Sequence, residues 1–372
     1  MPDPQHTAEV AFDPSDEYRP EPEPEAEPPA WKDGSVRIGI HTSIAGDVVH
    51  SLEAARKLGC NALQIFSASP RMWPRAAARI PDADARRFRA SRLELGLGPL
   101  VIHGNYLINL AATQPMLRVR SVQAFHDELL RAVALGADFL VAHPGARGEA
   151  PFEQAADAVA LGIRQAARGV PLGNLRVLME NTSGMGTALG WRFEELAAIL
   201  ERLSDLPAGV CLDTAHTFEA GYDIRTAEGL QRTLHQIDDT IGLGRVFVVH
   251  ANDSKTPLGS RVDRHEHVGR GKIGLEAFRR ILNHPRLSAA GPQGLPGRAF
   301  ILETPIDRPG DDRRNVKTLW ALAGFTAKQA PRAEDGFSML RRPQNKPAKR
   351  RKPLGKAKAP KRRRAGKSGR KG

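Results

Sequence analysis

The residues most able to do chemistry gather in one stretch, which runs from His250 to Gly274 and reads HANDSKTPLGSRVDRHEHVGRGKIG. It begins at His250, the end of an apolar, β-like run, and then carries five more side chains that can bind a metal ion, namely Asp253, Asp263, His265, Glu266 and His267. A loop that follows a buried strand is where α/β proteins place their chemistry, because the scaffold holds the loop while solvent still reaches it. The stretch therefore predicts a metal site that the ends of other strands complete.

Eight apolar runs with β propensity alternate with amphipathic helical stretches, the pattern of parallel βα units. The runs predict strands at residues 37–41, 62–66, 100–103, 138–143, 176–180, 208–213, 245–250 and 300–303. Helices are expected between and after them at residues 47–58, 82–95, 117–135, 152–167, 193–203, 227–241, 275–282 and 312–322. Eight such units close most naturally into a (β/α)8 TIM barrel, because right-handed crossovers keep every helix outside. A doubly wound sheet is the alternative.

Six consecutive strands of this series each end on a histidine or a carboxylate, namely His103, His143, Glu180, Asp213, His250 and Glu303. In a barrel the carboxyl ends of the strands converge on one face. His216 follows Asp213 by three residues, and Asp263 and His265 come from the stretch after the seventh strand. Together these nine side chains make a candidate ligand set of five His, two Asp and two Glu.

Imidazole and carboxylate ligands without thiolate suit Zn²⁺ best, with Mn²⁺ or Fe²⁺ as alternatives at one position. A catalytic metal takes three or four protein ligands and keeps one position for water, so the set suits two or three ions. For a single histidine, a hydrogen-bonded core or surface role is the better interpretation. For six residues that all end consecutive strands, that interpretation is the weaker one, because burying unpaired carboxylates costs several kcal/mol each.

Four further residues have the types that support metal ligands through hydrogen bonds. His41 ends the first predicted strand and is a candidate for this role. Asp253, Glu266 and His267 suggest ligands at first, but the strand ends already supply a sufficient set. We therefore assign these three the supporting role as well.

The formal charge of +13 is distributed unevenly along the chain. Residues 341–372 hold 16 Lys and Arg and no acidic residue, whereas residues 1–30 hold 9 acidic residues and one Arg, which leaves +5 between them. The first segment, rich in Pro and Glu, cannot bury enough apolar surface to offset the entropy of ordering. We expect an acidic disordered tail over residues 1–33, a barrel domain over 34–328 and a basic disordered tail over 329–372.

Two cysteines, Cys60 and Cys211, make a disulfide framework unexpected and favour a reducing compartment. The first residues lack the basic and apolar regions of a signal peptide, and no apolar run approaches the roughly 18 residues that span a bilayer. The sequence thus predicts a cytoplasmic protein, nucleoid-associated if the cell is bacterial, without a membrane partner.

The chain resembles the endonuclease IV family of apurinic/apyrimidinic endonucleases, which belongs to the xylose-isomerase-like TIM barrel superfamily. The matching motifs run from about Arg37 to Pro305 and are HTS with AGD, FSASPRMW, HGNYLINLA, HPG, ENTSG, LDTAHTFEAGYD, HANDSK, GSRVDRHEHVGRGKIG and LETP. DTxH with the downstream DRHExxGxGxIG is highly specific. The chain departs from the family where Ala45-Gly46 replaces a common Gly pair and where Ala215 replaces a frequent Cys, and none of these positions carries a ligand.

The resemblance implies three zinc ions, one with His103, His143 and Glu180, a second with Glu180, Asp213, His250 and Glu303, and a third with His216, Asp263 and His265. It also implies that three residues enter DNA at the abasic site. These are Arg71 in the loop after the second strand and the pair Tyr106 and Leu107 after the third. Packing within the loops is the plainer interpretation of these three residues.

The implied enzyme is a hydrolase of the deoxyribonuclease IV (phage-T4-induced) type that acts in base excision repair. It would cut the phosphodiester on the 5′ side of an abasic site in double-stranded DNA, leave a 3′-hydroxyl and a 5′-deoxyribose phosphate, and remove groups that block 3′ ends. A metal cluster would lower the pKa of a bridging water and stabilise the leaving oxygen, with Glu180 as the bridging catalytic carboxylate. The flipped sugar would leave a gap that Tyr106 and Leu107 fill.

The expected partner is DNA, which the basic tail would contact through the phosphate backbone in a salt-dependent way. The family precedent is a monomer. Two other functions share the fold or the charge: a metal-dependent sugar isomerase or epimerase, and a non-catalytic protein that binds DNA damage. The third-ion residues and the Arg71 and Tyr106 loops argue against the first alternative, and the intact ligand set argues against the second.

Overall fold

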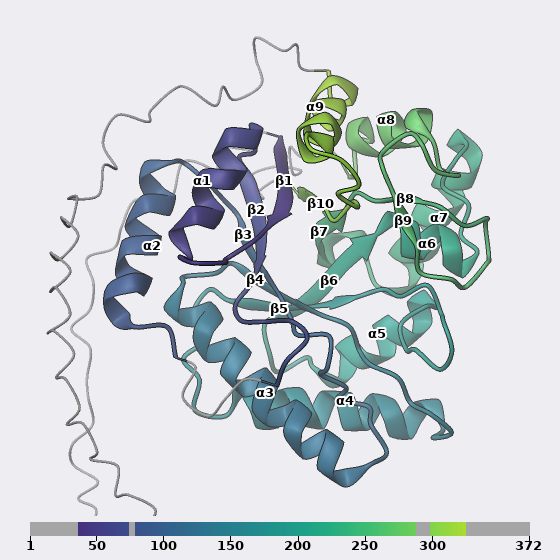
Figure 1. Cartoon of the computed structure of the whole chain (residues 1–372). Helices are drawn as coiled ribbons and strands as arrows, with labels where there is room; N and C mark the ends of the chain where they lie inside the picture. Colours follow the sequence, from purple (N-terminus) through teal and green to yellow (C-terminus); the bar gives the residue numbers. More distant parts are fainter. Residues whose placement is uncertain (1–35, 74–78, 288–297, 325–372) are drawn as a thin grey trace, which may run out of the picture. The chain divides into compact units, whose positions relative to one another are not determined.

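Eight parallel strands close into a barrel in the order β1-β10-β7-β6-β5-β4-β3-β2 in the computed structural model (Figure 1). Their bounds are β1 Arg37–Thr42, β2 Ala62–Phe66, β3 Leu100–His103, β4 Phe139–Ala142, β5 Arg176–Glu180, β6 Ala208–Asp213, β7 Val246–His250 and β10 Ala299–Leu302. Because β1 pairs in parallel with both β2 and β10, the sheet has no free edge. The predicted TIM barrel is confirmed, and the doubly wound sheet is excluded.

The structure describes residues 36–73, 79–287 and 298–324. All of them belong to the first of two compact units, Met1–Asp335, and the second unit, Gly336–Gly372, lies outside them. The predicted acidic and basic tails also lie outside the described residues. The domain limits at residues 33 and 328 therefore stay predictions.

A helix follows each barrel strand, at bounds close to those predicted. Their bounds are α1 Val49–Leu58, α2 Asp82–Glu94, α3 Pro115–Ala134, α4 Phe152–Ala167, α5 Phe193–Arg202, α6 Thr214–Ala220, α7 Ala227–Thr240, α8 Leu275–Asn283 and α9 Asp311–Leu322, with a short 3-10 turn at Leu243–Arg245. Gly59 ends α1 in the left-handed region at φ 86°, where its N–H caps the last turn. Among the described helices, none is both long and apolar enough to cross a membrane.

Four short elements were not predicted. They are the seven-residue helix α6, the 3-10 turn, and the two strands β8 (Asp253–Ser254) and β9 (His265–Glu266), which pair antiparallel. The Asp213 side chain caps α6 by accepting a hydrogen bond from the backbone N–H of His216 at 2.8 Å. Because this cap starts a helix directly at the end of β6, the metal-capable side chains of Asp213 and His216 lie one helical turn apart.

Apolar side chains fill the inside of the barrel and a second layer between the strands and the helices. The inner layer is formed by Ala62, Val101, Val141, Leu178, Cys211, Val248, Ala299 and Ile301. Gly39 belongs here because a Cβ at its position would lie 2.6 Å from the carbonyl oxygen of Ala62. Burial raises the pKa of the Cys211 thiol to about 12, so it is not a thiolate at neutral pH.

The strand register decides which side chains meet above this layer. Asp213 lies opposite His250 in the β6–β7 pair, and His250 lies opposite Ile301 in the β7–β10 pair. Closed parallel pairing therefore brings polar residues at successive strand ends to one height above a dry, packed interior.

The inner layer makes a stability prediction. Leu178→Ala should lower the free energy of unfolding by about 2–5 kcal/mol, because the fully buried side chain leaves a cavity in the barrel. The matched change Leu161→Ala, on α4 where the side chain is 55% exposed, should cost less than about 1 kcal/mol. Urea unfolding followed by circular dichroism measures both values, and equal losses would contradict this account of the core.

Candidate metal centre

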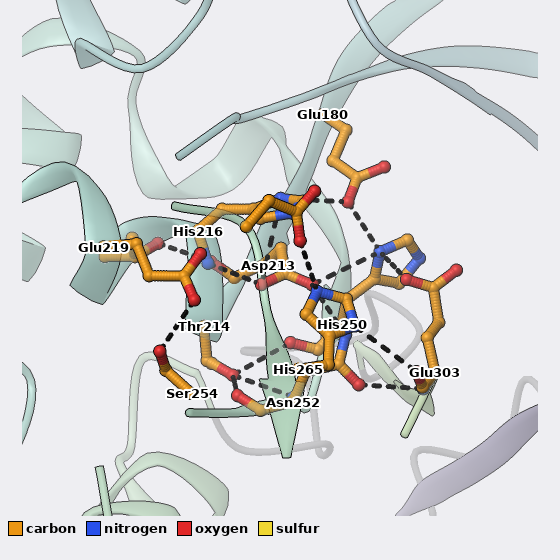
Figure 2. Close-up of polar contacts among 12 residues, drawn as sticks. Glu180, Asp213, Thr214, His216, Glu219, His250, Asn252, Ser254, His265 and Glu303 are labelled. Carbon is orange, nitrogen blue, oxygen red and sulfur yellow. Dashed lines mark hydrogen bonds and ion pairs between the residues drawn. The ribbon is translucent and has the colours of Figure 1, made fainter. Parts of the chain in front are cut away.

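All nine predicted ligands lie at the carboxyl-end face of the barrel, and Figure 2 shows Glu180, Asp213, His216, His250, His265 and Glu303 converging there. Four of the six strand-end residues occupy the last position of a strand, whereas His143 and Glu303 follow β4 and β10 by one residue. Three clusters of metal-capable residues within this set each have their ligand atoms within 4.8 Å of one another. The structure thus brings the predicted set together.

Glu180 lies at the centre of the set and is fully buried. One carboxylate oxygen, Oε2, lies 3.2 Å from His103 Nε2 and 3.0 Å from His143 Nε2. The other, Oε1, lies 2.9 Å from His250 Nδ1 and 3.5 Å from His216 Nδ1. Its two oxygens face different histidines, which is the arrangement that a carboxylate shared between two neighbouring cation positions requires.

A second group surrounds His250 at the end of β7. Its Nδ1 atom lies 3.2 Å from Glu303 Oε2 and 3.9 Å from Asp213 Oδ2, in addition to its contact with Glu180. Both His250 and Asp213 are completely shielded from solvent. Three carboxylates around one imidazole nitrogen make a strongly negative position that a divalent cation would neutralise.

A third group combines α6 with the β8–β9 hairpin. Asp263 lies 3.3 Å from His216 Nε2 through Oδ2 and 3.6 Å from His265 Nε2 through Oδ1. Asp213 Oδ2 also comes within 3.7 Å of His265 Nε2. Asp213 therefore reaches both the second and the third group, whereas the predicted division placed it in the second group alone.

Hydrogen bonds to backbone carbonyls fix three of the five imidazoles. The contacts are His103 Nδ1 to Gly104 O at 2.8 Å, His216 Nδ1 to Asn181 O at 2.9 Å and His265 Nδ1 to Glu303 O at 3.3 Å. Because a carbonyl oxygen only accepts, each Nδ1 carries the hydrogen and each Nε2 presents a lone pair toward the carboxylates. The buried Nε2 of His265 has no hydrogen-bond partner among the described residues. Lone pairs aimed at carboxylates fit a divalent metal ion.

Gln64, which the sequence analysis missed, sets the orientation of His250. This amide is fully buried in β2, and its Nε2 donates to Glu303 Oε1 at 2.5 Å. Since a carboxylate cannot donate, the amide oxygen must face His250 Nε2, which lies 2.8 Å away and therefore carries the hydrogen. His250 Nδ1 is then free for a metal. An amide inside the apolar run ALQIF was the signal available in the sequence.

His41 reaches the centre through the same amide. Its Nδ1 lies 3.0 Å from Gln64 Nε2 and 3.7 Å from Glu303 Oε1. Burial outweighs the nearby Glu303 carboxylate and lowers the pKa of His41, in keeping with a neutral ring that accepts from the amide. This placement suits the supporting role assigned to it.

The charges of the centre perturb one another strongly. Burial alone would raise the pKa of Glu180, but His250 and His143 outweigh it and lower that pKa well below its usual range. Burial would lower the pKa of His216, yet Asp213 and Asp263 raise it well above its ordinary value. The raised pKa values of His216 and of His250, which also lies beside several carboxylates, favour protons on these two rings, and a metal ion must displace them. Acid therefore competes with metal binding.

Asp253 stabilises a loop through hydrogen bonds to its backbone, and its carboxylate has no hydrogen bond to a predicted ligand among the described residues. Its buried carboxylate accepts hydrogen bonds at 2.8–3.3 Å from five backbone N–H groups, those of Ser254, Gly269, Gly271, Ile273 and Gly274. A Cβ on Gly271 would come within 2.4 Å of Asp253 Oδ1, so only glycine fits there. Asp253 also pairs with Glu266 in the β8–β9 hairpin that carries His265.

His267 forms a further group with Glu266 and Asp307 that has the residue types of a metal site. The amide of Asn315 argues against that use, because its Oδ1 accepts from the N–H of Val268 at 3.2 Å and its Nδ2 faces His267 Nδ1 at 3.0 Å. His267 Nδ1 is therefore the acceptor, and its Nε2 donates to Asp307 Oδ2 at 3.2 Å. In this arrangement His267 ties the loop to the start of α9 and offers no lone pair to a metal.

The three residues predicted to enter DNA lie on two adjoining loops. Asn105 joins the loops, since its amide donates to backbone carbonyls on both sides of Arg71 at 2.9 and 2.8 Å and its Oδ1 accepts from the N–H of Leu107 at 2.8 Å. Tyr106 is 56% exposed, and its ring centroid lies 5.8 Å from that of His103. The loops thus border the metal centre, and their contact with DNA stays a prediction.

Glu219 is a second functional residue that the sequence analysis missed. It lies on α6, and its Oε1 accepts from Ser254 Oγ at 2.7 Å (Figure 2). The same oxygen accepts from the N–H of Arg264 at 3.2 Å. Burial raises the pKa of Glu219 to about 7. These bonds join α6 to the hairpin that carries Asp263 and His265. The third group therefore depends on a carboxylate that binds no metal itself.

Comparisons with known proteins relate this chain to named families. A family model described as Xylose isomerase-like TIM barrel matches residues 52–341. A curated protein of Solibacter usitatus (strain Ellin6076), named "Probable endonuclease 4", is 50% identical over 293 residues, which cover 78% of this chain and 97% of that protein. Over three quarters of the chain thus aligns with nearly the whole of this relative.

The chain is also similar to solved structures. The crystal structure of endonuclease IV from Thermus thermophilus is 42% identical with a TM-score of 0.67, and the match covers 77% of this chain and 99% of that one. A D-psicose 3-epimerase from Clostridium cellulolyticum H10 has a TM-score of 0.55 at 14% identity, with 80% of this chain and 100% of that chain covered. The latter likeness shows the fold alone.

Gln64→Leu tests the orientation of His250. Loss of the amide removes the acceptor for His250 Nε2, so affinity for the metal ion at the second group should fall about 10–100-fold. Titration of zinc against a chelator of known affinity measures this change. The matched control is Gln123→Leu on the exposed side of α3, which should keep wild-type affinity. Unchanged affinity in Gln64→Leu would show that the amide does not orient this ligand.

Glu219→Ala tests the tie between α6 and the hairpin. We expect about one third of the bound metal to be lost under mild chelation, because Asp263 and His265 lose their tether while the other two groups are untouched. Glu219→Gln keeps an oxygen acceptor and should retain more metal, and the exposed Glu201→Ala should match the wild type. Metal per chain is counted by plasma mass spectrometry. Full retention in Glu219→Ala would refute the tether.

Proposed function

The chain belongs to the endonuclease IV family of xylose isomerase-like TIM barrels, and from this premise we propose that it is a metal-dependent hydrolase that cuts DNA at abasic sites. The observation that carries the proposal is the convergence of five imidazoles and four carboxylates, in which hydrogen bonds aim the lone pairs of four of the rings inward. A site of this composition suits divalent cations.

The proposed reaction is hydrolysis of the phosphodiester on the 5′ side of an abasic site in double-stranded DNA, with a 3′-hydroxyl and a 5′-deoxyribose phosphate as products. Removal of groups that block 3′ ends belongs to the same chemistry. Bound divalent cations would supply an activated water and would stabilise the leaving oxygen. Zn²⁺ suits the ligand set best, with Mn²⁺ or Fe²⁺ as alternatives at one position.

Three ions are proposed, each at one of the groups described above. His103 and His143 would hold the first with Glu180, which would also reach the second beside His250, and Asp263 would hold the third. Glu180 is the proposed catalytic residue, because its two oxygens would hold neighbouring cations that act on one phosphate. Its lowered pKa keeps it ionised for that purpose.

Tyr106 and Leu107 are proposed to fill the gap that the flipped sugar leaves, with Arg71 beside them. Burial, reinforced by Glu303 and Glu180, raises the pKa of Tyr106 to about 12, so the phenol is neutral at any working pH. A neutral, half-exposed ring packs between bases at little desolvation cost. The three residues would thereby exclude water from the abasic site and keep the flipped sugar over the metal ions.

The proposed partner is DNA, contacted by a monomer in the cytoplasm, at the nucleoid if the cell is bacterial. The domain limits at residues 33 and 328 are part of this proposal. The basic segment 329–372, outside the described residues, would add salt-dependent attraction to phosphates. An epimerase on the same barrel is disfavoured by the third group, since a small sugar needs neither that ion nor a Tyr106 wedge.

Incubation of the zinc-loaded protein with a duplex that holds one abasic analogue tests the proposal. We expect a single cut on the 5′ side of the analogue and none in an intact duplex. Asp263→Asn should lower kcat at least about 100-fold, since even residues that only support metal ligands cost 10–100-fold, and the exposed Asp239→Asn should match the wild type. Gel analysis of end-labelled strands measures both.

Absence of incision by protein whose three metal ions are confirmed would refute this function. Cleavage of intact and abasic DNA at equal rates would refute the role of the abasic site. Turnover of a ketose sugar by the same preparation would favour the epimerase.

A further inference from the structure

A cavity of 480 Å³ lies among three loops that each contain or directly follow a proposed metal ligand. The loop after β4 begins with His143, the loop after β5 follows Glu180, and the loop between β8 and β9 contains Asp263. The residues that give the cavity its chemistry are Arg147, Gly186, Trp191, Arg192, Glu195 and Arg261. We refer to it as the arginine pocket. None of its lining residues is among the predicted ligands or DNA-entering residues.

Backbone hydrogen bonds hold the first two loops together and so fix the position of Arg147. The N–H of Leu189 donates to Gly145 O at 2.8 Å, and the N–H of Arg147 donates to Thr187 O at 3.1 Å. Thr187 Oγ1 accepts from the N–H of Gly148 at 3.1 Å. A loop held in this way presents its guanidinium from a rigid base, which lowers the entropic cost of binding a ligand.

Arg261 enters the pocket from the third loop in an unusual conformation. Among the non-glycine residues that the structure describes, it alone has a positive φ, at 52°. Its N–H donates to Glu219 O at 3.0 Å, and its guanidinium lies 4.0 Å from the centroid of the Trp191 ring. A backbone conformation of this kind costs free energy, and such residues cluster at binding and active sites. The cation–π contact with Trp191 restrains the guanidinium, whose N–H groups can still donate to a ligand.

The pocket has an excess of positive charge. Arg147, Arg192 and Arg261 face a single lining carboxylate, Glu195, whose Oε2 already accepts from the N–H of Gly190 at 2.8 Å. Arg192 has an ion pair at 3.7 Å with a glutamate that does not line the pocket. Several guanidinium groups in one concave site match the geometry of a phosphate, which they bind through paired N–H donors.

We propose that the arginine pocket holds a backbone phosphate of the DNA strand next to the bond that is cut. The inference rests on the proposed function. The wedge loops follow β2 and β3, whereas the pocket is formed by loops that follow β4, β5 and β8, so both sites belong to loops next to the proposed ligands. A strand held at both sites would cross the metal centre in a defined register. Contact with a phosphate alone would make this grip independent of base sequence.

Duplexes with one uncharged methylphosphonate linkage, placed in turn at each position near the abasic analogue, test the proposal. With the zinc-loaded wild-type chain, one position outside the cut bond should lower kcat/KM about tenfold, as expected for loss of a charge-assisted contact. Arg261→Gln should lower kcat/KM on unmodified DNA by a similar factor. In that variant, the methylphosphonate at the same position should have no further effect.

Arg147→Gln provides a second variant on a different loop, in case Arg261→Gln disturbs the neighbouring Asp263. Metal content is measured for both. The matched control is Arg168→Gln, an exposed arginine at the far end of α4, which should keep the wild-type response to every methylphosphonate. The plot of log KM against log salt concentration should lose about one unit of slope in each pocket variant and none in the control.

Two results would overturn the pocket proposal alone. One is a wild-type chain that cuts abasic DNA and tolerates every methylphosphonate outside the cut bond. The other is a pair of pocket variants that keep full metal content and respond to the modified duplexes as Arg168→Gln does. If the wild-type chain fails to cut unmodified abasic DNA, the proposed function itself has failed, so the two failures are distinguished.

Discussion

The buried carboxylate of Glu180 is the constraint on which the rest of the site depends. A charge with no exposure to solvent is stable only when opposite charges or donors surround it, and here four imidazole nitrogens lie within 2.9–3.5 Å of its two oxygens. Only a closed parallel barrel delivers side chains from so many strand ends to one point. The proposed chemistry therefore follows from the topology, with Glu180 as the group that every other strand end must accommodate.

A second layer of contacts decides what these side chains can do. Carbonyl oxygens hold His103, His216 and His265, while the Gln64 amide holds His250, so each ring presents a lone pair inward. In the absence of cations, the nearby carboxylates raise the pKa values of His103, His216 and His250, and protons on these rings balance part of the negative charge. With cations, the same geometry becomes a preorganised ligand set. The acidic residues and the orientation of the rings are thus two parts of one arrangement for holding positive charge.

The barrel and the nine candidate ligands could be predicted from the sequence. The strands of a βα barrel are apolar runs, and most of the candidate ligands are the residues that end these runs. The strand-end series from His103 to Glu303 needed only that periodicity. Helix α6 did not follow, since seven residues carry no helical period, and the two-residue strands β8 and β9 are too short to leave a pattern. Gln64 contacts a residue 186 positions away, so its place as an amide in an apolar run marks it as unusual but does not reveal its partner. Arg71, Tyr106 and Leu107 came from family resemblance rather than from physical chemistry.

The central claim is that the nine side chains hold three metal ions, two of which share Glu180. Anomalous diffraction at the zinc absorption edge, from crystals of the zinc-loaded protein, tests it most directly. The account predicts three peaks at the carboxyl-end face of the barrel, with Glu180 between two of them and the third beside His216, Asp263 and His265. A single peak, or a peak beside His267 and Asp307 in place of one of these three, would contradict it.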